Sequence, residues 1–308
     1  MARHVIHVDR PLTDDDLAHV ADRAEIVGPD DDTLASAAAA VIGVRYVWDA
    51  ERFARFPDLR VVSRMGIGYD NVDVAAADAA GVVVCNAPDA PTVSTAEHAL
   101  ALLLAVCREL PVMADRCREG LGAPPAPTAL ELDGSTLGLV GYGRIGRRVG
   151  AAAAALGMRV LVSDPAISAG DDELGPVEVV DLDAVIEASD VISLHAPAVP
   201  ATHHLVGPST LPRMRRGVRI VNCARGSLVD QDALLAALDG GQVAGAGLDV
   251  TDPEPLPVDH PLLHRSDVIV TPHTASSTAA GRRRLFEHGF DHALAVLEGR
   301  DAPIVSGR

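Results

Sequence analysis

Residues 137–165 read as a strand, a glycine-rich turn, a helix and a second strand, in the sequence LGLVGYGRIGRRVGAAAAALGMRVLVSDP. An apolar run precedes Gly141, an alanine-rich stretch follows Gly146, and a second apolar run ends before Asp164. Two strands joined through a helix lie parallel in one sheet, because the helix carries the chain back to the edge where the first strand began. This stretch therefore restricts the fold to the α/β class with a parallel sheet.

Short apolar runs alternate with amphipathic stretches in two series along the chain. The first series predicts strands at residues 4–8, 24–27, 40–44, 59–63 and 81–85. The second begins with the run before Gly141 and predicts strands at residues 159–163, 191–195, 219–223, 244–250 and 267–271. Helices are expected at 13–23, 72–80, 92–118 and 275–299, and a Gly/Pro-rich loop or arm at 120–134. A chain of 308 residues with this alternation predicts two doubly wound α/β domains.

The glycine-rich turn after the strand at 137–140 contains Gly141, Gly143 and Gly146, which form the pattern G-x-G-x-x-G. Glycine at these positions lets the backbone turn tightly and approach a pyrophosphate at the helix N-terminus. Asp164 follows Gly146 by 18 residues, near the offset of about 20 at which an acid bonds the ribose of NAD. The alternative is a tight turn without a ligand, but the strand–helix–strand context favours NAD.

Composition excludes several functions. The chain contains no lysine, since all 26 of its Lys+Arg residues are arginine. Schiff-base chemistry and the phosphate-loop lysine are therefore excluded. A formal net charge of −17 argues against nucleic-acid and anionic-membrane partners. The four cysteines show no C-x-x-C spacing, so we expect them to be free thiols in a reducing compartment. The apolar run at 99–106 is too short to span a bilayer, and we expect a cytoplasmic protein.

Polar residues follow three of the predicted strands of the second series. Arg225 follows the run ending in Cys223, Glu254 stands between two prolines after Val250, and His273 follows the last strand. Each residue has a plain structural explanation, as a turn cap, a solvated loop acid or a structural histidine. Ligands of open α/β sheets bind at the carboxyl ends of the strands, so the three together predict a site.

Ordered motifs over nearly the whole chain carry a family resemblance. They are GIGYDNVD, STAEHALALLLA, GLVGYGRIG, HAPAVPATHHLV, VNCARGSLVDQDALLAAL, GAGLDV, DPEP and VTPHTA. With these motifs the sequence resembles the NAD-dependent D-2-hydroxyacid dehydrogenases, in the branch of phosphoglycerate dehydrogenase and glyoxylate/hydroxypyruvate reductase. The resemblance implies an NAD(H)-dependent enzyme that interconverts a D-2-hydroxy acid and its 2-oxo acid. Its substrate stays open among 3-phosphoglycerate, glyoxylate and hydroxypyruvate.

The resemblance implies a role for each of the three strand-end residues. Arg225 would bind the substrate carboxylate and polarise the carbonyl, which suits a planar guanidinium. His273 would exchange the hydroxyl proton, because histidine titrates near neutral pH. Glu254 would pair with His273.

The remaining implied site residues bind substrate or cofactor. Ile67 and Gly68 would offer backbone N–H groups to the substrate carboxylate. Arg45 and Arg64 could each meet an anionic substrate tail, or equally be surface or interdomain arginines. Asp249 would lie near the nicotinamide carboxamide. The implied cofactor-binding positions are Thr95, Gly141, Gly143, Arg144, Ile145, Gly146, Asp164, His195, Pro197, Cys223, Ala224 and Asp249.

Family topology implies a discontinuous chain organisation. A flavodoxin-like substrate domain would comprise residues 1–98 and 275–308, and a Rossmann NAD-binding domain would comprise 99–274. The site would lie in a cleft between the domains, and a homodimer is expected.

Two other functions compete with this interpretation. His288 and His292 stand four apart on one predicted helix face, as metal ligands can, but no acid completes a set. A solvated helix face is the better interpretation, and no metal is expected. The second alternative is an NAD-sensing corepressor on the same fold, a binding protein that would retain the same three strand-end residues.

Overall fold

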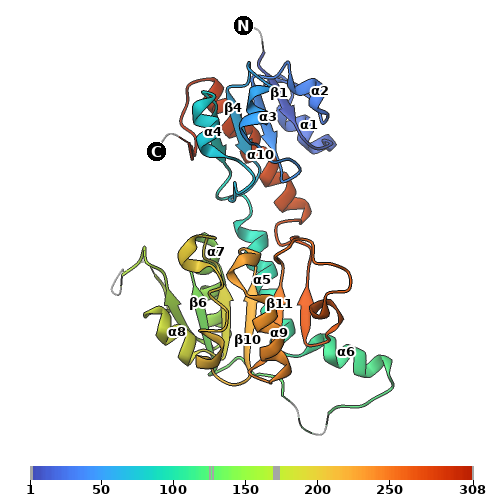
Figure 1. Ribbon diagram of the computed structural model, residues 1–308, viewed down its shortest axis with the longest axis vertical. Helices are drawn as coiled ribbons and strands as arrows, with labels where there is room; N and C mark the ends of the chain where they lie inside the picture. Colours follow the sequence, from blue (N-terminus) through green and yellow to red (C-terminus); the bar gives the residue numbers. More distant parts are fainter. Residues whose placement is uncertain (1–2, 125, 127, 169–173, 307–308) are drawn as a thin grey trace. The chain divides into compact units, whose positions relative to one another are not determined.

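A computed structural model describes residues 3–124, 126, 128–168 and 174–306. The chain divides into two compact units, Met1–Thr92 with Ser277–Arg308, and Val93–Ser276 (Figure 1). Below, these are unit 1 and unit 2. Each contains one wholly parallel sheet flanked by helices. The predicted α/β class with two doubly wound sheets is confirmed.

Unit 1 has a five-stranded sheet in the order β2-β1-β3-β4-β5. Its strands are β1 (Val5–Val8), β2 (Glu25–Val27), β3 (Ala39–Ile42), β4 (Val61–Arg64) and β5 (Val83–Asn86). Its helices are α1 (Asp14–Val20), α2 (Asp31–Leu34), α3 (Ala50–Ala54), α4 (Val74–Ala79) and α10 (Ala279–Leu297). The order 2-1-3-4-5 is that of flavodoxin-like sheets.

Two apolar layers cover the faces of the unit 1 sheet. Phe286 and Phe290 of α10 pack with β1, β3 and β4 on one face. Trp48 and Phe53, from the α3 region, pack with the other face. The chain's few aromatic residues are therefore concentrated in this unit, where they fill space that alanine and valine leave.

Unit 2 has a seven-stranded sheet in the order β12-β11-β10-β9-β6-β7-β8. Its strands are β6 (Thr136–Val140), β7 (Arg159–Ser163), β8 (Glu178–Val179), β9 (Val191–Leu194), β10 (Val218–Asn222), β11 (Val243–Leu248) and β12 (Val268–Val270). Its helices are α5 (Thr92–Cys107), α6 (Leu110–Arg118), α7 (Arg144–Ala155), α8 (Leu182–Ala188) and α9 (Gln231–Asp239). Helices α8 and α9 cover one face, and α5 and α7 the other. The strand order reverses between β6 and β9, as at the switch point of dinucleotide-binding sheets.

The predicted continuous helix over 92–118 is wrong. Two separate helices, α5 and α6, occupy this stretch (Figure 1). The helix is interrupted at Glu109, which adopts a left-handed φ of 52°. Pro111 follows within the first turn of α6. Its ring would clash with the carbonyl of Cys107 in a continuous helix, and it has no N–H to donate. The two-residue strand β8 was also not expected from the sequence.

Short polar side chains set where several helices begin. The side chain of Asp73 accepts a bond from the N–H of Ala76, and Thr278 accepts from Gly281. Because this cap satisfies a free backbone donor, α10 begins at Ala279 and not at 275 as the pattern indicated. Within the described residues, no helix has the length and apolar character needed to cross a bilayer.

Candidate active site

The site residues predicted in unit 2 follow strands that are neighbours in its sheet. Reading across the order β12-β11-β10, the loops after these strands carry His273, Glu254 and Arg225 in turn. His195 follows β9, and the glycine turn follows β6. Because all the strands are parallel, these loops share the carboxyl edge of one sheet.

His273 and Glu254 form a direct pair. The Nδ1 of His273 lies 2.6 Å from the Oε1 of Glu254. Since a carboxylate only accepts, Nδ1 carries the proton and donates it, and Nε2 is left for another partner. Both side chains are about two-fifths exposed, 41% and 38%, so a small molecule can reach the ring.

The turn that carries His273 is organised by Asp249, at the end of β11. The Asp249 side chain is 1% exposed. Its Oδ1 accepts from the Thr271 hydroxyl at 2.6 Å and the Thr274 N–H at 2.8 Å, and its Oδ2 accepts from the Ala275 N–H at 2.9 Å. The backbone N–H of His273 donates to the Asp249 carbonyl oxygen at 2.8 Å. Asp249 therefore holds His273 in its left-handed conformation, φ 50°, which an L-residue adopts at some cost.

Arg225 lies on a loop whose backbone is bonded by the side chain of Asn222, a completely buried residue. The Asn222 amide donates to the Arg225 carbonyl at 2.8 Å, and its oxygen accepts from the Ala224 N–H at 2.9 Å. A Cβ on Gly226 would lie 2.0 Å from the carbonyl oxygen of Thr251. Gly226 thus lets the Arg225 loop pack directly on the loop that leads to Glu254. Asn222 and Gly226 were not among the predicted site residues, although both stand within the VNCARG motif.

The glycine turn has the shape that a dinucleotide needs. Gly141 has φ 93°, and a Cβ there would lie 2.7 Å from the carbonyl group of His195. A Cβ on Gly146 would lie 2.4 Å from the Gly141 oxygen. Gly143, by contrast, has no neighbouring atom within 4 Å of its Cβ position and caps α7 without a side-chain bond. The free N–H groups of α7 and the open space at Gly143 fit a pyrophosphate.

Asp164, at the end of β7, is placed by backbone donors. Its Oδ2 accepts from the Tyr142 N–H at 2.7 Å, and its Oδ1 from the Ala166 N–H at 2.8 Å. Carboxylate oxygens have further lone pairs, so Asp164 can also accept from ribose hydroxyls. Arg144 is exposed and Ile145 half-buried in the first turn of α7.

Several implied cofactor positions follow β9 and β10, and one lies on α5. The Nε2 of His195 lies 2.9 Å from the Ser193 hydroxyl, and burial lowers the pKa of His195 to about 4, so the ring is neutral at neutral pH. Burial, and then the charge of Asp249, raise the pKa of the Cys223 thiol, which is therefore not a nucleophile. Pro197 is exposed, Ala224 is half-buried, and Thr95 is buried on α5.

The substrate residues predicted in unit 1 follow β3 and β4, which are adjacent. Arg45 is exposed, and its guanidinium lies 4.9 Å from the Tyr46 ring centre. Arg64, at the end of β4, donates to the Met65 carbonyl. Ile67 is exposed, and its carbonyl accepts from the Asn86 amide at 2.7 Å. Asn86, which is not among the predicted site residues, thus shapes the Ile67–Gly68 loop.

His288 and His292 do not form the solvated helix face that the pattern predicted. Both are half-buried, and the His292 Nδ1 lies 2.9 Å from the Asn86 carbonyl oxygen. Burial is the main cause that lowers the pKa of His292. Among the described residues no group of three or more potential ligands could hold a metal ion.

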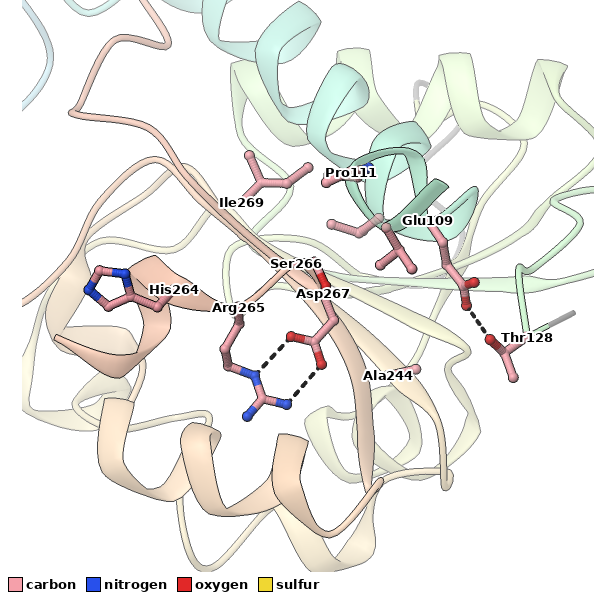
Figure 2. A pocket seen from close by; sticks show the side chains of 11 residues that line it. Glu109, Pro111, Thr128, Ala244, His264, Arg265, Ser266, Asp267 and Ile269 are labelled. Carbon is pink, nitrogen blue, oxygen red and sulfur yellow. Dashed lines mark hydrogen bonds and ion pairs between the residues drawn. The ribbon is translucent and has the colours of Figure 1, made fainter. Parts of the chain in front are cut away.

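A pocket of about 490 Å³ lies elsewhere in unit 2, near the amino ends of β11 and β12 (Figure 2). The Glu109 carboxylate accepts from Thr128, and Arg265 makes two bonds to Asp267, at 2.8 and 2.9 Å. The lining of this pocket contains none of the predicted site residues. The opposite end of the strands carries the candidate active site.

The geometry of unit 2 defines a dinucleotide-binding domain, and comparison with known proteins makes this specific. Residues 100–275 match the family described as D-isomer specific 2-hydroxyacid dehydrogenase, NAD binding domain. The D-3-phosphoglycerate dehydrogenase of Mycobacterium tuberculosis is 41% identical over 311 residues, which cover 98% of this chain and 58% of that protein. The glyoxylate reductase of Korarchaeum cryptofilum is 43% identical over 262 residues, or 83% of this chain and 78% of that protein.

Solved structures agree with these relatives. The crystal structure of the TT0316 protein from Thermus thermophilus matches with a TM-score of 0.87 and 38% identity, covering 98% of this chain and 99% of that one. The chain belongs to the D-isomer specific 2-hydroxyacid dehydrogenase family, and unit 2 contains its NAD-binding domain. It spans 58% of the length of the phosphoglycerate dehydrogenase relative.

Proposed function

We propose that the protein is an NAD(H)-dependent oxidoreductase that interconverts a D-2-hydroxy acid and its 2-oxo acid. The observation that carries the proposal is the His273–Glu254 pair at 2.6 Å, on an NAD-binding sheet whose next strand leads to Arg225. An acid/base group and a carboxylate-binding cation are what oxo-acid reduction requires beside the cofactor.

The cofactor supplies the hydride. The residues that would hold it are those at the ends of β6, β7, β9 and β10 and on α5, with the Gly143 turn at the pyrophosphate and Asp164 at the ribose. The others are Thr95, Gly141, Arg144, Ile145, Gly146, His195, Pro197, Cys223 and Ala224. Asp249, which the resemblance places near the nicotinamide, also accepts bonds from the His273 turn through both carboxylate oxygens.

Arg225 and His273 divide the work on the substrate. The guanidinium of Arg225 binds the carboxylate and stabilises charge that grows on the carbonyl oxygen. The Nε2 of His273 gives its proton to that oxygen in reduction and removes it in oxidation. Glu254 orients the ring through Nδ1 and compensates the charge of the protonated ring.

The substrate class is a small 2-oxo or 2-hydroxy acid. Backbone N–H groups of Ile67 and Gly68 would bind its carboxylate, and Arg45 and Arg64 would meet an anionic tail. Relatives named D-3-phosphoglycerate dehydrogenase and glyoxylate reductase support 3-phosphoglycerate and glyoxylate as substrates to test. Hydroxypyruvate, which the family resemblance implies, is the third.

The test is NADH oxidation by the purified protein with a panel of 2-oxo acids, repeated with NADPH. We expect turnover of at least one acid and a preference for NADH, because Asp164 repels the 2′-phosphate of NADP. Tight NADH binding without turnover of any acid would favour the corepressor-like alternative, which the dehydrogenase names of the relatives do not support. Equal use of NADPH would contradict the role of Asp164.

We propose further that the protein is a cytoplasmic homodimer. Its four cysteines are free thiols, as is usual in reducing compartments. Helix α6 has no buried residue, and Leu110 is 55% exposed, so this apolar surface can be covered by a second copy. Light scattering of the purified protein measures the mass, and a monomer at micromolar concentration would contradict the dimer.

A further inference from the structure

A histidine with no assigned role lies behind the His273 turn. His98 is on α5, three residues after Thr95, and its side chain is 25% exposed. Its Nε2 lies 3.0 Å from the Thr271 hydroxyl oxygen and 3.5 Å from the Asp249 Oδ1. Thr271 and Asp249 are the two side chains at the base of the turn that carries His273.

The bonding pattern determines which nitrogen of His98 carries a proton. The Thr271 hydroxyl has one hydrogen, and at 2.6 Å it points to the Asp249 carboxylate, which can only accept. The Thr271 oxygen must therefore accept from His98, so Nε2 is the protonated nitrogen. A continuous series of donors then runs from His98 through Thr271 to Asp249.

We infer that His98 is a positioning residue for the proposed reaction and that it acts on His273 through Thr271 and Asp249. The inference rests on the proposed function for its kinetic effect, though not for the bonding itself. His98 fixes the Thr271 hydroxyl, the hydroxyl fixes the Asp249 carboxylate, and the carboxylate fixes the Thr274 and Ala275 N–H groups that follow His273.

Loss of the His98 donor has a specific consequence. The Thr271 hydroxyl then keeps one of its two partners, so its bond to Asp249 is held less firmly and the Asp249 carboxylate depends more on its backbone donors. His273 stands in a left-handed conformation and is sensitive to this loosening, because the surrounding bonds oppose its local backbone preference. A misplacement of about 1 Å at the acid/base group can lower the rate of the chemical step by up to about a hundredfold.

The first measurement separates turnover from cofactor binding. His98→Leu removes the donor, whereas His98→Gln keeps an N–H donor at about the distance of Nε2. We expect His98→Leu to lower kcat by about tenfold or more, with the KM for NADH within twofold of the parent. His98→Gln should regain most of the lost kcat, and the melting temperatures of the two variants should agree.

The second measurement tests the route through Thr271. Thr271→Val removes the hydroxyl at nearly constant volume, so it should reproduce the His98→Leu defect. If the effect passes through this hydroxyl, the double variant is no slower than either single variant. Multiplied defects in the double variant would overturn the inference.

The third measurement needs neither cofactor nor turnover. Amide hydrogen exchange in the peptide that contains Thr274 and Ala275 should quicken by about tenfold in His98→Leu, and return toward the parent rate in His98→Gln. If the parent turns over no 2-oxo acid, the proposed function fails while this result still decides the role of His98.

The control is His264→Leu, the same chemical change at an exposed histidine of unit 2 whose ring bonds the Val258 carbonyl. It should leave both kcat and exchange at the His273 turn unchanged. The inference is wrong if His98→Leu behaves like this control, or if His98→Leu and His98→Gln are equally impaired.

Discussion

Arg225 and His273 each depend on a buried neighbour that bonds the backbone beside them. Asn222 holds both sides of the loop at Arg225, and Asp249 holds the residues after His273. Glu254 is held differently, through its own bond to the histidine ring. Reactive groups that stay partly exposed can be precise in this way, because their rigidity comes from buried polar groups beneath them.

Arg225→Lys is expected to be a severe change. Lysine keeps the charge but lacks the planar fork that can engage a carboxylate and its neighbouring carbonyl together. We expect kcat/KM for the oxo acid to fall about 100- to 1000-fold, with NADH affinity by fluorescence titration unchanged. Arg216→Lys, at an exposed arginine of the same unit, is the matched control. Near-normal turnover of Arg225→Lys would assign this work to another arginine.

Glu254→Gln should lower turnover in both reaction directions. Glutamine keeps the shape of the side chain and can still accept the Nδ1 bond, but it no longer compensates the charge that the His273 ring carries when protonated. We expect kcat to fall by about tenfold or more, with NADH affinity unchanged. Glu254→Ala, which also removes the acceptor that orients the ring, should be slower still. A kcat of Glu254→Gln equal to that of the parent would show that the carboxylate charge is not needed.

The junction of β6 and α7 is the element at which we expect the pyrophosphate of the cofactor to bind. Its glycines serve different purposes. Gly141 and Gly146 permit close packing inside the protein, whereas Gly143 faces open space. One short motif therefore contains both a folding requirement and a binding requirement.

Alanine substitutions should separate these two requirements. Gly141→Ala forces a Cβ to within 2.7 Å of the His195 backbone at φ 93°, so we expect the free energy of unfolding to fall by about 2 kcal/mol or more. Gly143→Ala should leave stability within about 0.5 kcal/mol but weaken NADH binding at least tenfold, because its Cβ enters the pyrophosphate space. Denaturant unfolding and NADH titration measure the two effects. Unchanged NADH affinity in Gly143→Ala would place the cofactor elsewhere.

Both units place their predicted site residues, apart from Thr95 on α5, at the carboxyl ends of parallel strands. Unit 1 does so after β3 and β4, and unit 2 after β6, β7 and β9 to β12. Parallel sheets need helices on both faces, so the chemistry is confined to the strand ends and the loops that follow them.

His195 links this arrangement to global stability. Its pKa is about 4 in the folded protein and near 6.5 when unfolded, because burial disfavours the charged ring. The unfolded chain therefore binds the proton first, and the stabilisation present above pH 6.5 is lost as the pH falls toward 4.

His195→Gln removes this titration. The stability advantage of the parent over the variant should shrink by about 2 kcal/mol between pH 7 and pH 5. Urea unfolding of both proteins at each pH measures it. A difference that stays constant with pH would mean that the His195 ring binds its proton equally well in the folded and unfolded chains.

The features that depend on local pattern could be predicted from the sequence. Strand–helix alternation, the glycine turn, and the placement of Arg225, Glu254 and His273 after strands are all visible over a few residues, because hydrophobic period and turn chemistry are local. The family motifs added the prediction that the cofactor is NAD. The break at Glu109 was missed, although Pro111 was a visible signal for it.

The order of the strands in the folded sheet determines which strand ends are neighbours, and therefore which residues can act together. The order β12-β11-β10 places the strand that leads to Glu254 between the strands that lead to His273 and Arg225. Asp249 became the anchor of a turn only through contacts with residues 22 to 26 positions later. The bond from His98 to Thr271 spans 173 positions. Such contacts have no sequence period, because packing brings the partners together only after the chain has folded.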